Sequence, residues 1–124
     1  ISKLSEAKGH GSSFISAAPL VIVVAADSRK TDVWTEDCSI ASIIVQLEAE
    51  HLGLGSCWVQ IRLRETKQKE SSETYVRKIL SLPEYYAVES LIGIGYPADE
   101  RMQKEKKALQ WEKCHRDSFS NRFQ

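Results

Sequence analysis

The sequence predicts a single domain in which strands and helices alternate, that is, a mixed α/β order. Three observations carry this prediction: an apolar, valine-rich run near the N-terminus, a long apolar helix that ends at a Gly-Leu-Gly turn, and a second apolar run closed by Pro97. The length of 124 residues suits one domain with a modest core. The predicted order is strand, helix, strand, helix, strand and a charged tail.

The first strand is predicted at residues 20–26. This run is rich in valine and lacks polar alternation, which is typical of a central strand covered on both faces. Pro19 can only open such a strand, because proline has no N–H for the ladder. Residues 1–13 are polar and contain Gly9 and Gly11, so we expect a flexible lead-in there.

The long helix is predicted at residues 35–52. Thr35 stands in a capping position, and Glu36 and Asp37 lie where the helix dipole favours carboxylates. Apolar side chains cover most of the circumference, which predicts a buried helix; they are Ile40, Ile43, Ile44, Leu47 and Leu52. Gly53 then occupies the position at which a left-handed cap residue is expected.

The second half of the chain predicts a strand at 56–62, a hydrophilic surface loop at 64–72, a helix at 73–81 and a strand at 89–96. In the first of these strands, every second residue is apolar; Cys57, Val59 and Ile61 alternate with Trp58, Gln60 and Arg62. Residues 98–124 form a charged tail with three aromatic residues, Trp111, Phe119 and Phe123.

Composition excludes several classes of protein. Seventeen basic and seventeen acidic side chains cancel, so we expect no nucleic-acid partner. The longest apolar stretch, at 17–26, is too short to span a bilayer and no leader precedes it, so no membrane partner is expected. Three cysteines without a C-x-x-C pattern indicate a reducing, cytoplasmic setting. The helix dipole could lower the pKa of Cys38, but small buried hydrophobic residues are the better interpretation of all three.

No catalytic side chain and no metal site is predicted. The hydrolase pattern G-x-S-x-G and the zinc pattern H-E-x-x-H are both absent. His51 is better explained as a complement to a helix C-terminus, and the adjacent Cys114 and His115 point in different directions on any regular element. A dinucleotide fingerprint is also excluded, because Gly53 and Gly55 follow a helix and precede a strand, and position 58 is tryptophan.

Four segments carry a resemblance to a known family: residues 18–27, the helix start at 34–37, residues 52–58 and residues 92–98. In this order and spacing, and with the ending at 111–115, the chain resembles the nitroreductase-like family of FMN-dependent oxidoreductases over about residues 14–119. The resemblance implies an α+β sandwich with a central mixed sheet flanked by helices. The family's N-terminal arginine-rich segment, which grips the FMN phosphate, has no counterpart here, so we expect the C-terminal portion of such a protein.

The resemblance also implies a cofactor site and a reaction. FMN would accept two electrons from NAD(P)H and pass them, by ping-pong transfer, to a nitro compound, a quinone or a similar small-molecule acceptor. The backbone after the Gly-Leu-Gly turn would line the flavin ring and donate an amide to its N5; the residues there are Trp58, Val59, Gln60 and Ile61. Basic residues of the tail would lie near the phosphate, namely Arg101, Lys104 and Lys106. Periodicity alone leaves the alternatives open. Trp58 and Ile61 could be ordinary core residues with Gln60 on the solvent side, and the basic residues of the tail could be a solvated helix face.

The resemblance further implies a homodimer, with the flavin at the dimer interface and the tail, residues 98–124, packed on the partner subunit. Aromatic residues on a charged segment suit such a contact. The alternative function is a non-catalytic fragment that cannot hold flavin by itself. A small α/β module that binds another ligand is the third class considered.

Overall fold

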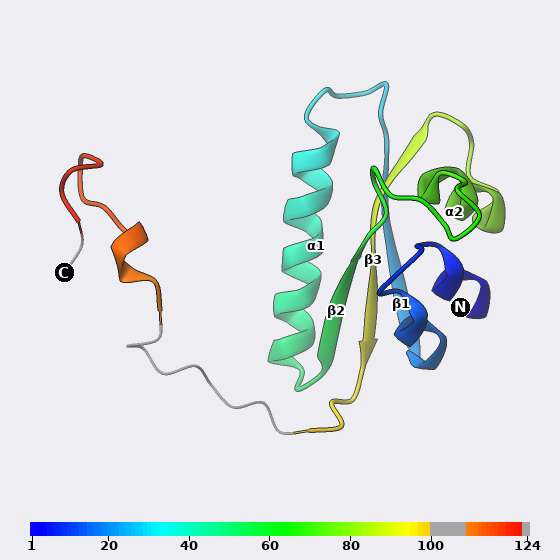
Figure 1. Cartoon of the computed structure of the whole chain (residues 1–124), viewed down its shortest axis with the longest axis horizontal. Coiled ribbons are helices and arrows are strands. Elements are labelled where there is room, and N and C mark those ends of the chain that lie inside the picture. Colours follow the sequence, from blue (N-terminus) through cyan, green and yellow to red (C-terminus); the bar gives the residue numbers. More distant parts are fainter. Residues whose placement is uncertain (100–108, 123–124) are drawn as a thin grey trace.

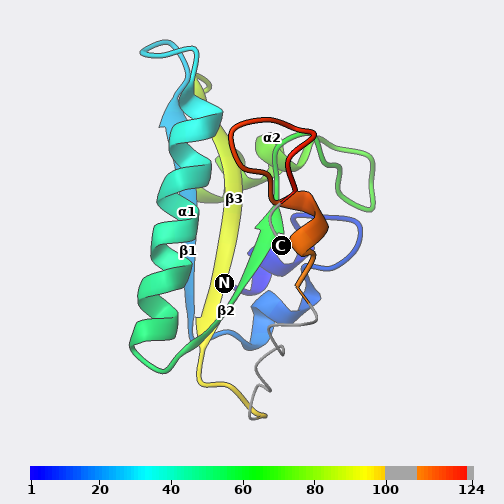
Figure 2. The same ribbon diagram turned by 90° about the vertical axis from the view of Figure 1, so that its left-hand side faces the viewer.

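The computed structural model describes residues 1–99 and 109–122. Three strands form one antiparallel sheet in the order β1-β3-β2; they are β1 (Leu20–Asp27), β2 (Gly55–Gln60) and β3 (Tyr86–Gly95). Helix α1 (Trp34–His51) covers one face of the sheet (Figure 1). Helix α2 (Ser72–Leu80) and two short 3-10 helices, η1 (Ser2–Glu6) and η2 (Ser13–Ala17), cover the other face (Figure 2). The predicted α+β class is confirmed.

The central strand is β3, and it is buried from residue 88 to residue 94. The prediction that residues 20–26 form the central strand was therefore wrong, because β1 lies at one side of β3 and is only half-buried along most of its length. The expected mixed sheet also differs from the structure, since every pairing between the described strands is antiparallel. An apolar run indicates a strand, but it determines neither the place of the strand in the sheet nor how far its two faces are covered.

The sheet separates two apolar cores. The larger core lies between the sheet and the elements η1, η2 and α2, and its members include Leu4, Ile15, Val59, Ile61, Val76, Val88 and Leu91. The smaller core lies between the sheet and α1, and it contains Ala49, Ile92 and Ile94 with Val45 and Leu54 at its margin. Leu91 and Ile92 of β3 therefore face opposite cores, as strand geometry requires, and the β-bulge at Glu89 brings Val88 to the same side as Leu91.

Helix α1 packs on the sheet through small side chains. Cys38, Ser42 and Ala49 are its buried residues, at a spacing that places them along one stripe. Its large apolar residues face away from the sheet and are exposed: Ile40 57%, Ile43 50%, Ile44 59% and Leu47 62%. The prediction that this helix is buried was wrong within the described part of the chain, because composition cannot tell a face that packs on the sheet from one that does not.

The turn between α1 and β2 is built as the sequence indicated. Gly53 has a φ of +72°, its N–H donates to the Glu50 carbonyl at 3.0 Å, and the Leu54 N–H donates to the Ala49 carbonyl at 2.8 Å. These two bonds form a Schellman cap, which requires the left-handed conformation that glycine adopts without strain. At the other end the helix begins at Trp34, one residue before the predicted position, and no side chain caps it.

The N-terminal segment packs on the sheet. Leu4, Ala7 and Ser12 are buried, and the Gly9 N–H donates to the Glu65 carbonyl at 2.8 Å. The expected flexible lead-in at residues 1–13 therefore differs from the structure, which holds this segment by buried side chains and backbone bonds. Close contact of η2 with the sheet depends on Gly93, because a Cβ there would lie 2.9 Å from Phe14 Cε2.

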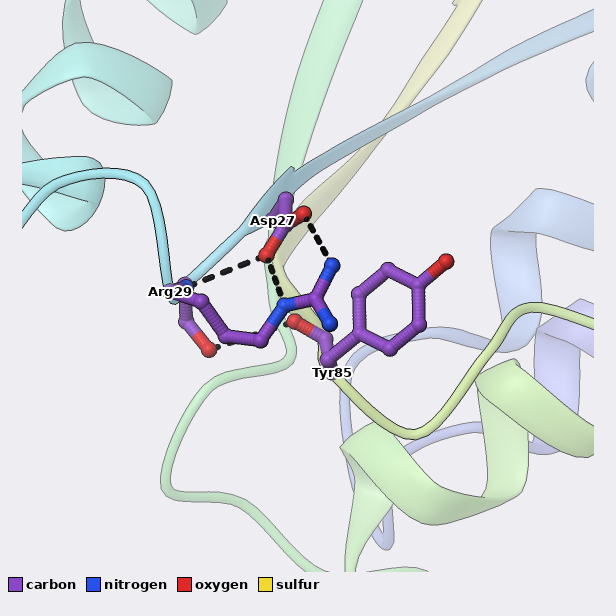
Figure 3. A network of polar contacts seen from close by, with 4 residues as sticks. Asp27, Arg29 and Tyr85 are labelled. Atoms are coloured by element: carbon purple, nitrogen blue, oxygen red, sulfur yellow. Dashed lines mark hydrogen bonds and ion pairs between the residues drawn. The ribbon is translucent and has the colours of Figure 1, made fainter.

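A polar cluster fixes the loop between β1 and α1 (Figure 3). The Arg29 guanidinium donates to both Asp27 carboxylate oxygens, at 2.9 and 2.8 Å, and its central carbon lies 3.5 Å from the centre of the Tyr85 ring. The hydrogen bond from Arg29 holds the pKa of Asp27 at about 2. The Ser28 N–H also donates to the Tyr85 carbonyl at 3.1 Å, so the cluster ties this loop to the start of β3.

The described part of the tail contains a 3-10 helix at Trp111–Lys113 and a bridge between His115 and Arg122. Its aromatic residues Trp111 and Phe119 are exposed.

Among residues 1–99 and 109–122, no helix has both the length and the hydropathy needed to cross a membrane.

Candidate functional site

The outer edge of β2 carries free backbone donors. Gln60 lies opposite Ser90 in β3, and the Ile61 N–H donates to the Glu89 carbonyl at 3.0 Å. In an antiparallel ladder this pattern makes Gln60 and Ser90 a non-hydrogen-bonded pair, so the Gln60 N–H points away from β3. By the same alternation the Trp58 N–H also points outward. No described strand pairs with this edge.

The four residues predicted to line a flavin thus divide into two pairs. Val59 and Ile61 direct their amides toward β3 and bury their side chains in the larger core. Trp58 and Gln60 direct their amides outward and place their side chains on the α1 side, half-buried. Only the second pair can offer backbone donors to a ligand at this edge.

The side chain of Gln60 is held along the strand. Trp58 Nε1 donates to Gln60 Oε1 at 3.3 Å, and Gln60 Nε2 donates to the Arg62 carbonyl at 3.2 Å. Both polar ends of the Gln60 amide are therefore engaged by neighbours on the same edge. A side chain held in this way does not compete for the outward backbone N–H.

Arg62 and Trp34 adjoin this edge. The central carbon of the Arg62 guanidinium lies 5.6 Å from the centre of the Trp34 ring, within cation–π range. Trp34 is the first residue of α1, and Arg62 follows the end of β2, so a contact between elements brings them together. We call them the Trp34–Arg62 pair.

Glu89 is a buried carboxyl next to the same segment. It is 4% exposed, and its Oε2 has no hydrogen-bond partner in the described part of the chain. In the pairing with β1, Val24 lies opposite Ser90 and Ala25 opposite Val88, so Glu89 is the extra residue of a β-bulge. Burial raises the pKa of Glu89; Arg62 acts in the opposite direction, and Glu73 raises it further.

The cysteines and histidines form no reactive cluster in residues 1–99 and 109–122. Cys38 is buried, and burial together with Glu89 and Asp37 raises its pKa, which favours the interpretation as a small core residue. Cys57 and Cys114 are exposed, so for them the expectation of burial was wrong. No group of three potential metal ligands occurs in these ranges.

The remaining predicted site residues, Arg101, Lys104 and Lys106, lie outside the described residues. Conversely, Trp34, Arg62 and Glu89 were not among the predicted site residues. A signal for Glu89 was visible, because it is the one charged residue within the apolar run from 87 to 96. No sequence pattern indicated that Trp34 and Arg62 would meet.

The geometry defines a class of protein: an α+β domain in which a glycine turn joins a helix to a strand, and in which the outer edge of that strand presents unpaired backbone amides. The sequence pattern of the Nitroreductase family matches residues 2–96. The chain belongs to the Nitroreductase family.

Solved structures and curated relatives agree with this assignment. The chain superposes on an FMN-dependent nitroreductase from Clostridium difficile R20291 with a TM-score of 0.91 and 41% identity, over 95% of this chain and 69% of that one. A protein of Archaeoglobus fulgidus is 36% identical over 105 residues, which are 82% of this chain and 57% of the relative. Its name is NADH dehydrogenase/NAD(P)H nitroreductase. A protein of the same name from Methanothermobacter thermautotrophicus is 33% identical over 102 residues, which are 80% of this chain and 50% of the relative. The chain thus spans about half the length of the curated relatives that it matches.

Proposed function

We propose that this chain is the portion of an FMN-dependent NAD(P)H oxidoreductase that holds the reactive edge of the flavin ring. The observation that carries the proposal is the outward N–H of Gln60 on the open edge of β2. A donor fixed by a sheet is suited to a ring nitrogen acceptor, because its orientation is set before the ligand binds. The name of the Clostridium difficile relative supports FMN, and the names of the curated relatives support NAD(P)H.

The flavin supplies the redox chemistry, namely acceptance of two electrons from NAD(P)H and their delivery to a nitro compound, a quinone or a similar acceptor. The residues of this chain bind and orient. The Gln60 amide would fix the ring at one edge, and Trp58 with the Gln60 side chain would limit access of water along that edge. The basic residues of the tail, Arg101, Lys104 and Lys106, are proposed for the phosphate.

The test is a pair of FMN titrations. One sample is the chain itself, and the other is a fusion in which the N-terminal segment of the Clostridium difficile relative precedes this chain; we call it the fusion protein. The fusion protein should bind FMN and oxidise NADH or NADPH when given a quinone or a nitroaromatic compound. The chain alone should bind more weakly than the fusion protein, because each charge-assisted bond that the added segment makes to the phosphate contributes about 1.5–3 kcal/mol. Absence of flavin uptake by the fusion protein would contradict the proposal.

The second candidate is a non-catalytic fragment that cannot hold flavin by itself. The matched segments cover 57% and 50% of the two curated relatives. Flavin uptake by the fusion protein without acceptor reduction would support this candidate.

We further propose a homodimer formed through α1. The four exposed apolar side chains of this helix lie on the face opposite its packed stripe, and a second copy of the same face is the natural partner in a symmetric dimer. Packing of residues 98–124 on the partner subunit and a cytoplasmic location belong to the same proposal.

A further inference from the structure

The guanidinium of Arg62 has unfilled donors. No hydrogen bond or ion pair of the described residues uses its side chain, and the residue is half-buried. Its contact is with the face of the Trp34 ring at 5.6 Å. A guanidinium over an aromatic ring keeps its five N–H donors available for a planar acceptor such as a carboxylate. Arg62 is therefore held in place while its hydrogen-bonding capacity is unused.

Glu89 lies close enough to influence this charge without pairing to it. Arg62 lowers the pKa of Glu89, yet no ion pair within 4.0 Å joins them, and the Oε2 of Glu89 has no donor. The Glu89 carbonyl accepts from the Arg62 N–H at 3.2 Å, which fixes the backbone of Arg62 beside the bulge. Consequently the positive charge of Arg62 is only partly balanced within the described chain.

The Trp34–Arg62 pair is joined to the open edge of β2. Gln60 Nε2 donates to the Arg62 carbonyl. This hydrogen bond links Gln60, which carries the outward amide, to Arg62, which carries the guanidinium. Trp34 is half-buried, so the part of its indole that Arg62 does not cover is accessible to an aromatic ring, and Arg62 offers a planar set of donors for a carboxylate.

We propose that the Trp34–Arg62 pair binds planar aromatic carboxylates and thereby makes carboxylated aromatic compounds the preferred acceptors of this protein. The binding step stands on the geometry of the pair, whereas the preference among acceptors rests on the proposed function. Arg62 is then a specificity-determining residue, and Trp34 provides the stacking surface.

Binding is tested on the chain without flavin. Nitrogen-labelled chain is titrated with para-nitrobenzoate, with its uncharged analogue para-nitrobenzamide and with inorganic phosphate, and the indole signal of Trp34 and the side-chain signal of Arg62 are followed by NMR. We expect para-nitrobenzoate to shift both signals and to bind at least about tenfold more tightly than the amide, as a charge-assisted bond provides. Arg62→Gln should remove this difference, and Glu89→Gln should increase it, because it removes the opposing charge.

Three outcomes would overturn the proposal. Equal binding of the carboxylate and the amide would show that Arg62 does not recognise charge. Equal competition by inorganic phosphate would show a general anion site without a role for the ring of Trp34. An unchanged ratio of the affinities for para-nitrobenzoate and para-nitrobenzamide in Arg62→Gln, shown by NMR to be folded, would place binding elsewhere. If Arg62→Gln does not fold, Arg62→Lys replaces it in the test. Arg62→Lys keeps the charge but loses the planar donors, so it should reduce the ratio.

The preference among acceptors is tested on the fusion protein. The ratio of kcat/KM for para-nitrobenzoate to that for para-nitrobenzamide should exceed about ten and fall toward one in Arg62→Gln. An active fusion protein with a ratio near one refutes the preference and leaves the proposed function intact. A fusion protein that takes up no flavin refutes the proposed function, while the NMR titration of the chain still decides binding.

Discussion

The exposed face of α1 gives the clearest quantitative prediction. Ile40, Ile43, Ile44 and Leu47 are between 50% and 62% exposed. Full burial of such a side chain contributes about 1.5–3 kcal/mol, so covering the exposed halves of all four contributes about 3–6 kcal/mol for each subunit. A symmetric dimer then gains about 6–12 kcal/mol, which is comparable with an association cost of about 4–15 kcal/mol. The gain can exceed the cost only while all four side chains are buried in the interface, so one charged substitution should prevent dimerisation.

The perturbation is Leu47→Glu. It removes the apolar contribution of Leu47 from both subunits, about 2–3 kcal/mol in total, and also places two carboxylates in the interface. The dimer dissociation constant should rise at least about thirtyfold from the apolar loss alone. The matched control is Leu80→Glu, a substitution of the same kind on α2, across the sheet from α1 (Figure 1).

Analytical ultracentrifugation over a range of concentrations measures the effect. The unmodified chain and Leu80→Glu should dimerise, whereas Leu47→Glu should sediment as a monomer with an unchanged circular dichroism spectrum. A dimer that survives Leu47→Glu with the same dissociation constant would refute the reasoning and would direct attention to the tail. An unmodified chain that is monomeric at every concentration would refute it as well.

Three further predictions follow from other parts of the molecule. In the fusion protein, Gln60→Pro should weaken FMN binding about tenfold or more relative to Gln60→Ala, because it removes an outward N–H that no ladder bond uses. Fluorescence titration measures the two affinities. Equal affinities in folded variants would show that this amide does not contact FMN. Ser42→Ala should lower the free energy of unfolding by about 1–3 kcal/mol in urea titrations. The buried Ser42 hydroxyl donates to the Cys38 carbonyl at 2.7 Å and lies 3.1 Å from the Ser90 hydroxyl, which would lose this partner. Adding Ser90→Ala should lower the free energy of unfolding by less than Ser42→Ala does. Because the pKa of Asp27 falls from 3.8 to about 2 on folding, its stabilisation is present above pH 3.8 and is lost as the pH falls toward 2. Asp27→Asn should therefore flatten this acid limb of the stability curve. An unchanged limb would show that the titration of Asp27 is not its cause.

Local signals in the sequence predicted local structure well. Gly53 indicated the end of α1 and the start of β2, because a left-handed cap is decided within a few residues. The alternation at 57–62 correctly predicted a strand in this segment, where the structure has β2 (Gly55–Gln60). The resemblance to the family was confirmed by the match over residues 2–96.

The errors concern information that a single segment does not contain. The apolar run at 20–26 predicted coverage on both faces, but its place beside β3 depends on how three distant segments pair. In α1, the large residues Ile43 and Ile44 suggested the inward face, whereas the small residues Cys38 and Ser42 allow the helix to approach the sheet closely. The Trp34–Arg62 pair joins residues 28 positions apart, as their numbers show, and only the folded chain brings them together.

The open edge of β2 has a consequence for handling the protein. Unpaired strand edges recruit other strands, and such pairing is a common route to aggregation. A ligand that occupies the Gln60 amide and a foreign strand that pairs with it would compete for the same donors, so occupation of the site also protects the polypeptide from self-templated assembly. On the proposed function, expression and refolding in the presence of FMN should therefore increase the yield of dispersed protein, and the flavin-free protein should be the form most prone to precipitate.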